Sequence, residues 1–267
     1  MKHQKRAEGR TLVIMIIVIA SAMVLILFGG KLYAAITGGA SDNACRLSIF
    51  AQSKLKGFTG KSPVSIECPR KEIIFYKDHV EEHIEGKSNN IKIKIGEKLE
   101  KKFKELDDVI VNQVIAEELR RCWYKTGEGE LDAFDEGGLL GTETCLLCST
   151  IEFDDEVINA GTVPFPDLMI YLENNKISPK GEEISYLDYL SKVKTARGFM
   201  WIPIQYKTFY QEEVDKIEPG KKYVVFMKSS KTSQFQEKIF QFPDTYWVLV
   251  GPEELIARKG VCDILLN

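Results

Sequence analysis

A single apolar run near the N-terminus constrains this chain more than any other feature of its sequence. Residues 12–30 hold no charged side chain, and Ser21 is their only polar one. A helix of this length spans about 28 Å at 1.5 Å per residue, close to the thickness of the hydrocarbon core of a bilayer. Because such a helix satisfies all its backbone groups internally, the sequence predicts a transmembrane helix over residues 11–30.

The flanking charges favour one orientation of this helix. Four basic residues precede the run and one follows it directly: Lys2, Lys5, Arg6, Arg10 and Lys31. The positive-inside rule then keeps the N-terminus in the cytoplasm. We expect a single-pass cell-membrane protein with a cytoplasmic basic tail (1–10), a linker (31–44) and an extracytoplasmic domain (45–267).

A cleaved signal peptide is the alternative to a retained anchor. Small residues at 33–35 and 38–40 would suit a cleavage site. The apolar core of a signal peptide is usually about 7–15 residues long, however, and this run is longer. A retained anchor is therefore favoured.

All the cysteines of the chain lie beyond the apolar run. They are Cys45, Cys68, Cys122, Cys145, Cys148 and Cys262. An even number of cysteines on the extracytoplasmic side predicts structural disulfides. The sequence does not choose among the pairings. We favour a bond from Cys122 to Cys145 or Cys148, and one from Cys262 that ties the C-terminus to the body.

Composition restricts the function of the body. Lysine and arginine number 36 against 39 acidic residues, and the net charge of the chain is −3. Nucleic-acid binding usually requires a basic excess, so no nucleic-acid partner is expected.

The clearest element in the body is a long helix. Residues 97–124 contain neither proline nor glycine, and their apolar side chains recur at spacings of three and four. This periodicity predicts a helix over Glu97–Tyr124 with Cys122 on its buried face. Gly127 and Gly129 would end it, as turn glycines with positive φ.

Shorter segments alternate between strand and helix patterns. The strands are expected at 64–68, 73–76, 91–95, 149–153, 199–206, 223–227, 238–242 and 246–250, and short helices at 168–172, 184–193 and 252–258. Because regular βαβ alternation is missing, these segments predict an α+β domain. It forms either one body or two lobes that meet near 155–165.

Several motifs resemble those of a known group. They are Cys45, Cys68, Ala116–Trp123, Gly127-Glu128-Gly129 with Phe134, Cys145–Ser149 and Cys262-Asp263. In these residues the chain resembles a family of uncharacterised archaeal single-pass membrane proteins with a cysteine-containing extracytoplasmic domain. The resemblance implies such a domain behind one anchor, and it implies no activity.

Cys145-Leu146-Leu147-Cys148 has the C-x-x-C spacing of redox-active sites. A redox-active pair needs a thiolate that a helix N-terminus or a cation stabilises. Here a strand is expected to follow the motif, so a structural disulfide role is favoured. Thiol-disulfide exchange in the cell envelope is the alternative function.

His79-Val80-Glu81-Glu82-His83 has the H-x-x-E-H spacing of inverted zinc peptidases. On a helix, His79 and His83 would share a face with Glu82 as the base, and Glu152 or Glu156 would be the third ligand. The segment is short and rich in glutamate, so a solvated charged helical turn is favoured over a zinc site.

No other motif provides a catalytic constellation. The glycines near 127–129 and 137–141 lack the Lys-Ser/Thr end of a phosphate-binding loop, and the only body histidines are the two above. We therefore expect a membrane-anchored, non-enzymatic binding or assembly module without a cofactor. Its partners would be the bilayer, through residues 11–30, and an unidentified protein or surface.

Overall fold

The structure is a computed structural model of the 267-residue chain. It describes residues 41–59, 66, 68–84, 91–92, 106–129, 142–160, 168–195, 198–201, 220–231, 245–256, 262 and 264–266. The chain forms two compact units, 1–44 and 45–267, and the fold described below is that of the second. None of the helices in the described ranges combines the length and the apolar content that crossing a bilayer requires. The predicted membrane segment 11–30 lies outside these ranges.

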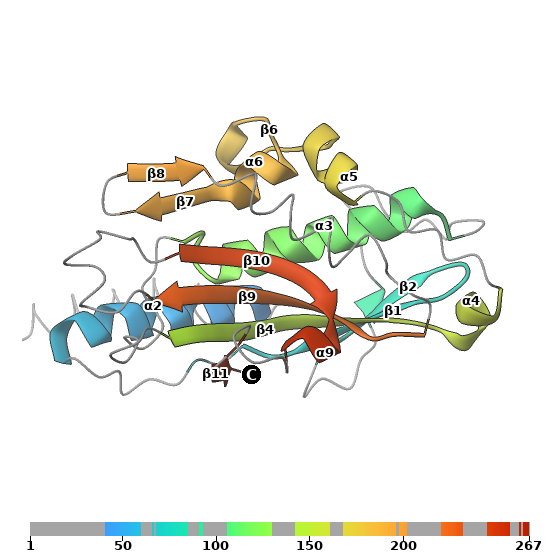
Figure 1. The fold of residues 1–267 in the computed structure, drawn as a ribbon, viewed down its shortest axis with the longest axis horizontal. Coiled ribbons are helices and arrows are strands. Elements are labelled where there is room, and N and C mark those ends of the chain that lie inside the picture. The colour runs from blue at the N-terminus through green and yellow to red at the C-terminus, as the bar shows by residue number, and fades with distance from the viewer. Residues whose placement is uncertain are drawn as a thin grey trace, which may run out of the picture. The chain divides into compact units, whose positions relative to one another are not determined.

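A mixed seven-stranded sheet forms the centre of the domain (Figure 1). Its strand order is β10-β9-β4-β1-β2-β3, and β11 also pairs with β4. The strands are β1 (Lys71–Phe75), β2 (Val80–Ile84), β3 (Ile91–Lys92), β4 (Thr142–Phe153), β9 (Tyr223–Lys231), β10 (Thr245–Pro252) and β11 (Ile264–Leu266). Two pairings are parallel, β1 with β4 and β11 with β4, and the others are antiparallel.

Strand β4 organises this sheet because it pairs along both edges. One edge pairs with β9, while the other pairs first with β11 at residues 144–146 and then with β1 at residues 149–153. The register with β9 shifts between Leu147 and Ser149, which marks a bulge at Cys148. Cys145 and Cys148 are three residues apart on this strand, and side chains alternate between the faces of a sheet, so the two cysteines reach different parts of the domain.

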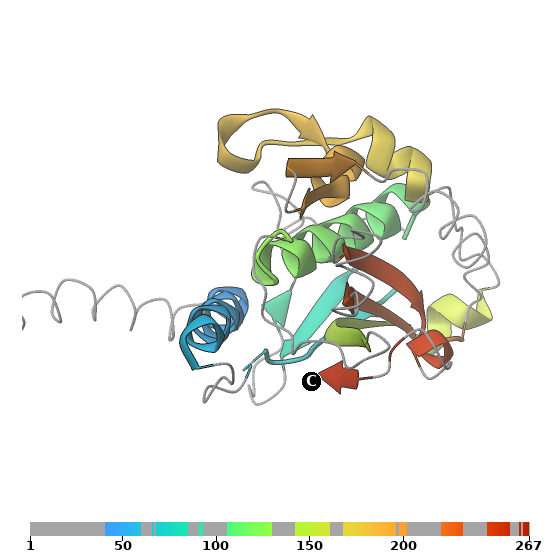
Figure 2. The same ribbon diagram turned by 60° about the vertical axis from the view of Figure 1, so that its left-hand side comes forward.

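Helix α3 (Asp108–Lys125) covers one face of the sheet (Figure 2). It buries a stripe at helical spacing, including Val111, Ile115, Leu119 and Cys122, against the strands. The buried position of Cys122 confirms the sequence prediction. The predicted start of this helix at Glu97 is wrong, because α3 begins at Asp108; residues 97–105 lie outside the described residues. Asp107 has extended backbone and its carboxylate accepts a hydrogen bond from the Ile110 N–H, at 2.8 Å, as an N-cap.

Short elements form a third layer on the far side of α3 (Figure 2). Helices α5 and α6 contact α3 there, and α6 leads into the β7–β8 hairpin. The remaining elements are α4 (Asp155–Asn159), α5 (Leu168–Asn174), β5 (Lys176–Ile177), η1 (Pro179–Gly181), β6 (Ile184–Ser185), α6 (Tyr186–Ser191), β7 (Lys192–Thr195), β8 (Gly198–Trp201) and α9 (Glu253–Ile256).

Most predicted strands and short helices within the described ranges are confirmed, with shifted ends. The helix expected at 184–193 is shorter, because residues 184–185 and 192–195 are strands. The predicted strand 238–242 lies outside the described residues, as do most of 64–68 and the ends of 91–95 and 199–206. The described residues of 64–68 are not in a strand.

Helix α2 (Ser41–Thr59) is an element that the sequence did not predict. Its first four residues were assigned to the linker. It buries Cys45 and Ile49, four residues apart, in the core cluster. Arg46 fixes it to the end of α3, because the guanidinium lies 4.0 Å from the centre of the Tyr124 ring and donates to the Tyr124 carbonyl.

Two tyrosines fix α6 to the outer face of α3. The Tyr186 hydroxyl donates to Glu117, and the Tyr189 hydroxyl donates to Glu128 at 2.6 Å. Burial, together with the carboxylate that accepts each hydrogen bond, raises the pKa of both hydroxyls well above the usual range of tyrosine. The neutral, hydrogen-bonded form of each tyrosine therefore belongs to the folded state.

Candidate functional site

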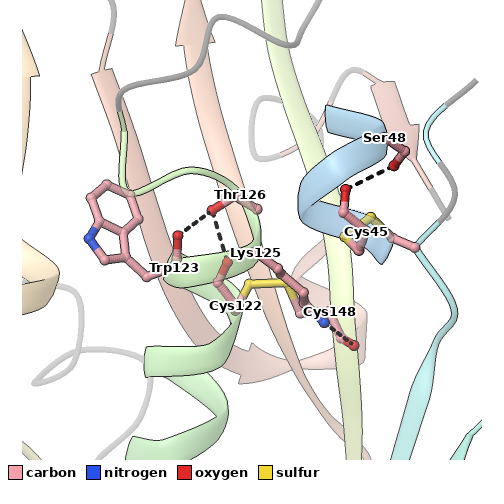
Figure 3. Close-up of a disulfide and its surroundings, with 8 residues drawn as sticks. Cys45, Ser48, Cys122, Trp123, Lys125, Thr126 and Cys148 are labelled. Atoms are coloured by element: carbon pink, nitrogen blue, oxygen red, sulfur yellow. Dashed lines mark hydrogen bonds between the residues drawn. A yellow bond between two sulfur atoms is a disulfide. The ribbon is translucent and has the colours of Figure 1, made fainter. Parts of the chain in front are cut away.

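The six cysteines form three disulfides in the structure. They join Cys45 to Cys68, Cys122 to Cys148, and Cys145 to Cys262. Of the two alternatives for Cys122, the structure selects Cys148, and Cys262 ties the C-terminal segment to β4 as expected. Figure 3 shows the Cys122–Cys148 bond between the end of α3 and the bulge of β4.

A buried lysine accompanies this bond (Figure 3). Lys125 is 2% exposed, and its ammonium donates to the Cys148 carbonyl at 3.4 Å. At the next residue, the Thr126 hydroxyl donates toward the Cys122 carbonyl at 2.9 Å and the Trp123 carbonyl at 3.0 Å. These contacts satisfy backbone carbonyls at the end of α3 and hold the disulfide in the core.

The structure does not join the two cysteines of the C-x-x-C motif to each other. Cys145 pairs across the sheet with Lys228, on the face away from α3, whereas Cys148 reaches α3. Both sulfurs are in separate disulfides and both residues are at most 1% exposed. A thiolate exchange site needs an accessible sulfur, so this arrangement favours the structural role.

The glycine turn after α3 fits the structural interpretation of Gly127 and Gly129. Gly127, Glu128 and Gly129 all have positive φ, which confirms the prediction for the two glycines. A Cβ on Gly129 would lie 2.9 Å from the buried Trp123 ring. The turn thereby presents Glu128 to Tyr189 and to Arg46, whose guanidinium is 3.9 Å away.

Charged side chains lie between α3 and the sheet. The Lys71 ammonium is 3.2 Å from Glu82, and the Arg121 guanidinium is 3.4 Å from Glu82 and 3.0 Å from Glu118. Lys71, Glu82 and Glu118 are all buried. We call these four residues the buried charge network. Charged side chains are usually buried in a protein interior only when they form ion pairs.

The central glutamate of the H-x-x-E-H motif, Glu82, belongs to the buried charge network. Residues 79–83 are not a helical turn, because residues 80–84 form strand β2, which a tight turn with a Tyr76 N–H to His79 carbonyl bond of 2.9 Å joins to β1. Alternation along β2 sends Glu82 into the core and His83 to the other face. The predicted solvated turn is therefore wrong, and the zinc triad His79, Glu82 and His83 is not assembled.

The other proposed metal ligands do not complete a site either. Glu152 lies on β4 and pairs with Lys222, and Glu156 lies on α4. Across the described parts of the chain, no three His, Cys, Asp or Glu side chains are grouped so that they could hold a metal ion.

A pocket with several polar lining residues lies on the face of the sheet away from α3. Its volume is about 290 Å³, and its lining residues are Arg70, Glu72, His83, Ile84, Thr150 and Lys222. We call it the β1–β2 pocket. Cross-strand register creates it, because Glu72 of β1 lies directly opposite His83 of β2 and Thr150 of β4. Directly opposed side chains share a face and lie within contact distance.

Ion pairs define one side of this pocket. The Lys222 ammonium contacts Glu152 closely and is 3.9 Å from Glu72. The hydrogen bond that Lys222 donates to Glu152 raises the pKa of Lys222, so this lysine stays charged. Lys222 therefore forms its main ion pair with Glu152, and its contact with Glu72 is long.

A chain of hydrogen bonds leads from the surface to His83. Asp78 contacts His79 Nδ1 at 2.7 Å, His79 Nε2 is 3.3 Å from one Glu81 oxygen, and His83 Nε2 is 3.1 Å from the other. Burial alone would raise the pKa of Glu81, but the hydrogen bonds from the two histidines outweigh it and lower that pKa. Glu81 is therefore an ionised acceptor, and it fixes the ring of His83 beside the pocket.

Of the lining residues, the sequence analysis identified only His83. Glu72, Thr150 and Lys222 belong to three segments that only the sheet brings together. A usable signal was present in the strands, because Glu72 and Glu152 alternate with buried residues. Alternation places a residue on a face, but it does not give the register between strands.

Comparison of the chain with protein-family models, curated proteins and solved structures finds no match. The resemblance to the archaeal membrane-protein family therefore stays a prediction.

Proposed function

We propose that this chain is a membrane-anchored extracytoplasmic binding module, non-enzymatic, with its N-terminus in the cytoplasm. The observation that supports this most is the pairing of all six cysteines in three disulfides. Such bonds persist in oxidising compartments and are rare in the cytosol. The apolar run at 12–30 and its basic flank provide the route by which the body would leave the cytoplasm.

The β1–β2 pocket is the proposed binding site of the module. It is a concave site with several convergent polar groups, which is the usual form of a small-ligand site. An envelope thiol-disulfide oxidoreductase that uses Cys145 and Cys148 is the alternative function. The burial of both sulfurs in different disulfides weighs against it.

Membrane fractionation with thiol counting tests the proposal on the full chain. We expect the protein to remain in carbonate-washed membranes. External protease should digest the body on cells stripped to the cytoplasmic membrane. Alkylation should find no thiol before reduction and six after it. A matched variant, Ile16→Arg/Ile19→Arg, puts two charges in the apolar run at about 2.5–3.5 kcal/mol each. It should lose the membrane fraction. A body that is protected from protease, or that holds free thiols, would contradict the proposal.

A trapping experiment separates the two functions. In Cys122→Ala/Cys148→Ala, which leaves no freed Cys122 thiol, an oxidoreductase would accumulate a mixed disulfide with another protein through Cys145. The binding module should show no such adduct on a non-reducing gel, because Cys145 remains bonded to Cys262.

A further inference from the structure

We infer that one face of helix α2 lies on the surface of the membrane that anchors the chain, with Leu47 and Phe50 at the boundary between lipid headgroups and acyl chains. We call this face, which Asn43, Leu47 and Phe50 define, the outer face of α2. The inference rests on the proposed membrane anchor, and it adds a second contact between the protein and the bilayer. The β1–β2 pocket plays no part in it.

Helix α2 has two sides of different character. Cys45 and Ile49 are buried in the core, whereas Leu47 is 41% and Phe50 is 46% exposed. Asn43 is exposed too, and positions 43, 47 and 50 recur at spacings of four and three. The three exposed residues therefore share one side of the helix, opposite the buried side.

The outer face lies in a part of the helix that is almost free of charge. Between residues 43 and 53, Arg46 is the only charged residue of the sequence. Its guanidinium donates to the Tyr124 carbonyl and lies 3.9 Å from Glu128, so its charge is directed to the body. The solvent side of a surface helix usually carries charged and polar residues. Leucine and phenylalanine are instead the residues that helices lying in a membrane interface bury among lipids.

The two apolar residues of the outer face are neighbours, since residues three apart meet on a helix surface. The other large hydrophobic side chains that are exposed in the described parts of the chain lie on three separate elements. They are Val109 on α3, Ile170 on α5 and Leu265 on β11. Apolar residues that are scattered singly need no explanation, whereas contiguous ones indicate a contact surface.

The bilayer is the partner that the chain itself brings to this face. Residues 31–40 separate the end of the apolar run at Gly30 from the start of α2 at Ser41. Even fully extended, these ten residues reach only about 35 Å. A short tether makes the contact intramolecular, with an effective concentration of roughly millimolar, so a weak contact through two side chains suffices. A second copy of the chain or another protein has no such tether.

A membrane contact of α2 would orient the whole body. The Cys45–Cys68 disulfide bonds the helix covalently to the chain that leads into the sheet, and Arg46 packs on the Tyr124 ring at the end of α3. Because α2 is held at these points, the body cannot turn independently of the outer face. The same side of the body would then always face the membrane.

Quenching by brominated lipid tests the contact on the full chain. Phe50→Trp is reconstituted in phosphatidylcholine vesicles, with or without bromine near the glycerol end of the acyl chains. Subtraction of the wild-type emission removes the signal of the three native tryptophans. Interfacial helices bury their apolar side about 5–10 Å deep, so the added tryptophan should lose at least about half of its emission to bromine.

Val109→Trp is the matched control. Val109 is 60% exposed, but it lies near the start of α3, about 22 Å along the helix from the Tyr124 ring that Arg46 contacts. A tryptophan at this position should lose little emission. Unquenched emission from Phe50→Trp would overturn the inference. If the emission of that variant then shifts with protein concentration, a second copy of the chain covers the outer face instead.

A charge on the outer face separates lipid contact from proximity. Leu47→Asp in the Phe50→Trp background puts a carboxylate at an exposed position, and its burial among lipids is unfavourable, so quenching should fall at least about twofold. Val109→Asp in the same background is the control and should leave quenching unchanged. Each variant should keep all its cysteines paired, which alkylation checks. Equal quenching with and without Leu47→Asp would overturn the inference.

The two proposals fail in different ways. A chain that a carbonate wash removes from the vesicles would refute the anchor, and the inference with it. A chain that resists the wash but leaves the added tryptophan unquenched would refute the contact of α2 alone. Retention with quenching at position 50 and not at position 109 supports both.

Discussion

Removal of the Cys145–Cys262 disulfide should destabilise the domain more than removal of either other bond. The cost arises because a cross-link restricts the unfolded chain, and it grows with the logarithm of the loop that the bond closes. Cys145 and Cys262 are 117 residues apart, whereas Cys122 and Cys148 are 26 apart. The loop-closure relation gives about 4.9 kcal/mol for the first bond and about 3.5 kcal/mol for the second.

The two bonds make a controlled pair because three of their four cysteines lie in the core and Cys262 packs against it. Cys145, Cys122 and Cys148 are all at most 1% exposed, so exchange to alanine loses similar packing at these positions. The difference of about 1.4 kcal/mol, a tenfold change in the folding equilibrium, therefore reports mainly on loop length.

Equilibrium urea unfolding of the oxidised full chain measures these costs. The free energy of unfolding is compared among wild type, Cys145→Ala/Cys262→Ala and Cys122→Ala/Cys148→Ala, after intact mass confirms two remaining bonds in each double variant. Cys45→Ala/Cys68→Ala, with a separation of 23 residues, should resemble the second variant. The reasoning is refuted if loss of the Cys145–Cys262 bond costs less than loss of Cys122–Cys148, or less than about 1 kcal/mol.

Three further substitutions test the interior. Glu82→Gln removes the carboxylate from the buried charge network and should lower the free energy of unfolding in urea by about 3–5 kcal/mol. Glu82→Leu/Lys71→Met removes both charges of the pair and should unfold within about 2 kcal/mol of wild type. A loss below about 1 kcal/mol in Glu82→Gln would contradict this. Tyr186→Phe should flatten the alkaline loss of stability. The raised pKa of Tyr186 means that its contribution is complete below the unfolded value of about 10 and falls as pH rises above it, so a curve equal to wild type from pH 9 to 11 would refute it. Gly129→Ala places a methyl group at a residue with positive φ, 2.9 Å from the Trp123 ring. It should lower the free energy of unfolding by about 2 kcal/mol and change the native tryptophan fluorescence. An unchanged melting temperature would count against this prediction.

Local periodicity was enough to predict the elements that bury a continuous apolar stripe. Helix α3 and strands β1, β9 and β10 belong to this group, because their buried residues recur at the period of the element. Strand β2 was misread as a helical turn. Its buried set is Val80, Glu82 and Ile84, and the glutamate at the centre hides the alternation. Glu82 is accommodated at that buried position by its ion pairs with Lys71, from the neighbouring strand, and with Arg121 of α3.

The candidate site was harder to predict than the fold for a related reason. Its residues extend from Arg70 to Lys222, and each one alone looks like an ordinary surface residue of a strand or turn. What brings them together is the register of β1 against β2 and β4. Register depends on long-range pairing, which a single sequence does not specify.

The disulfide pattern also constrains how this protein can be made. If thiols paired in their order along the chain, Cys45 would meet Cys68 correctly, but Cys122 would then take Cys145, and Cys148 would take Cys262. Two of the three bonds would be non-native. The native set thus requires that β4 and α3 dock before oxidation, or that thiol–disulfide exchange corrects the early bonds. A chain truncated before Cys262 would leave Cys145 as an unmatched thiol, so an incomplete copy would differ chemically from the complete one.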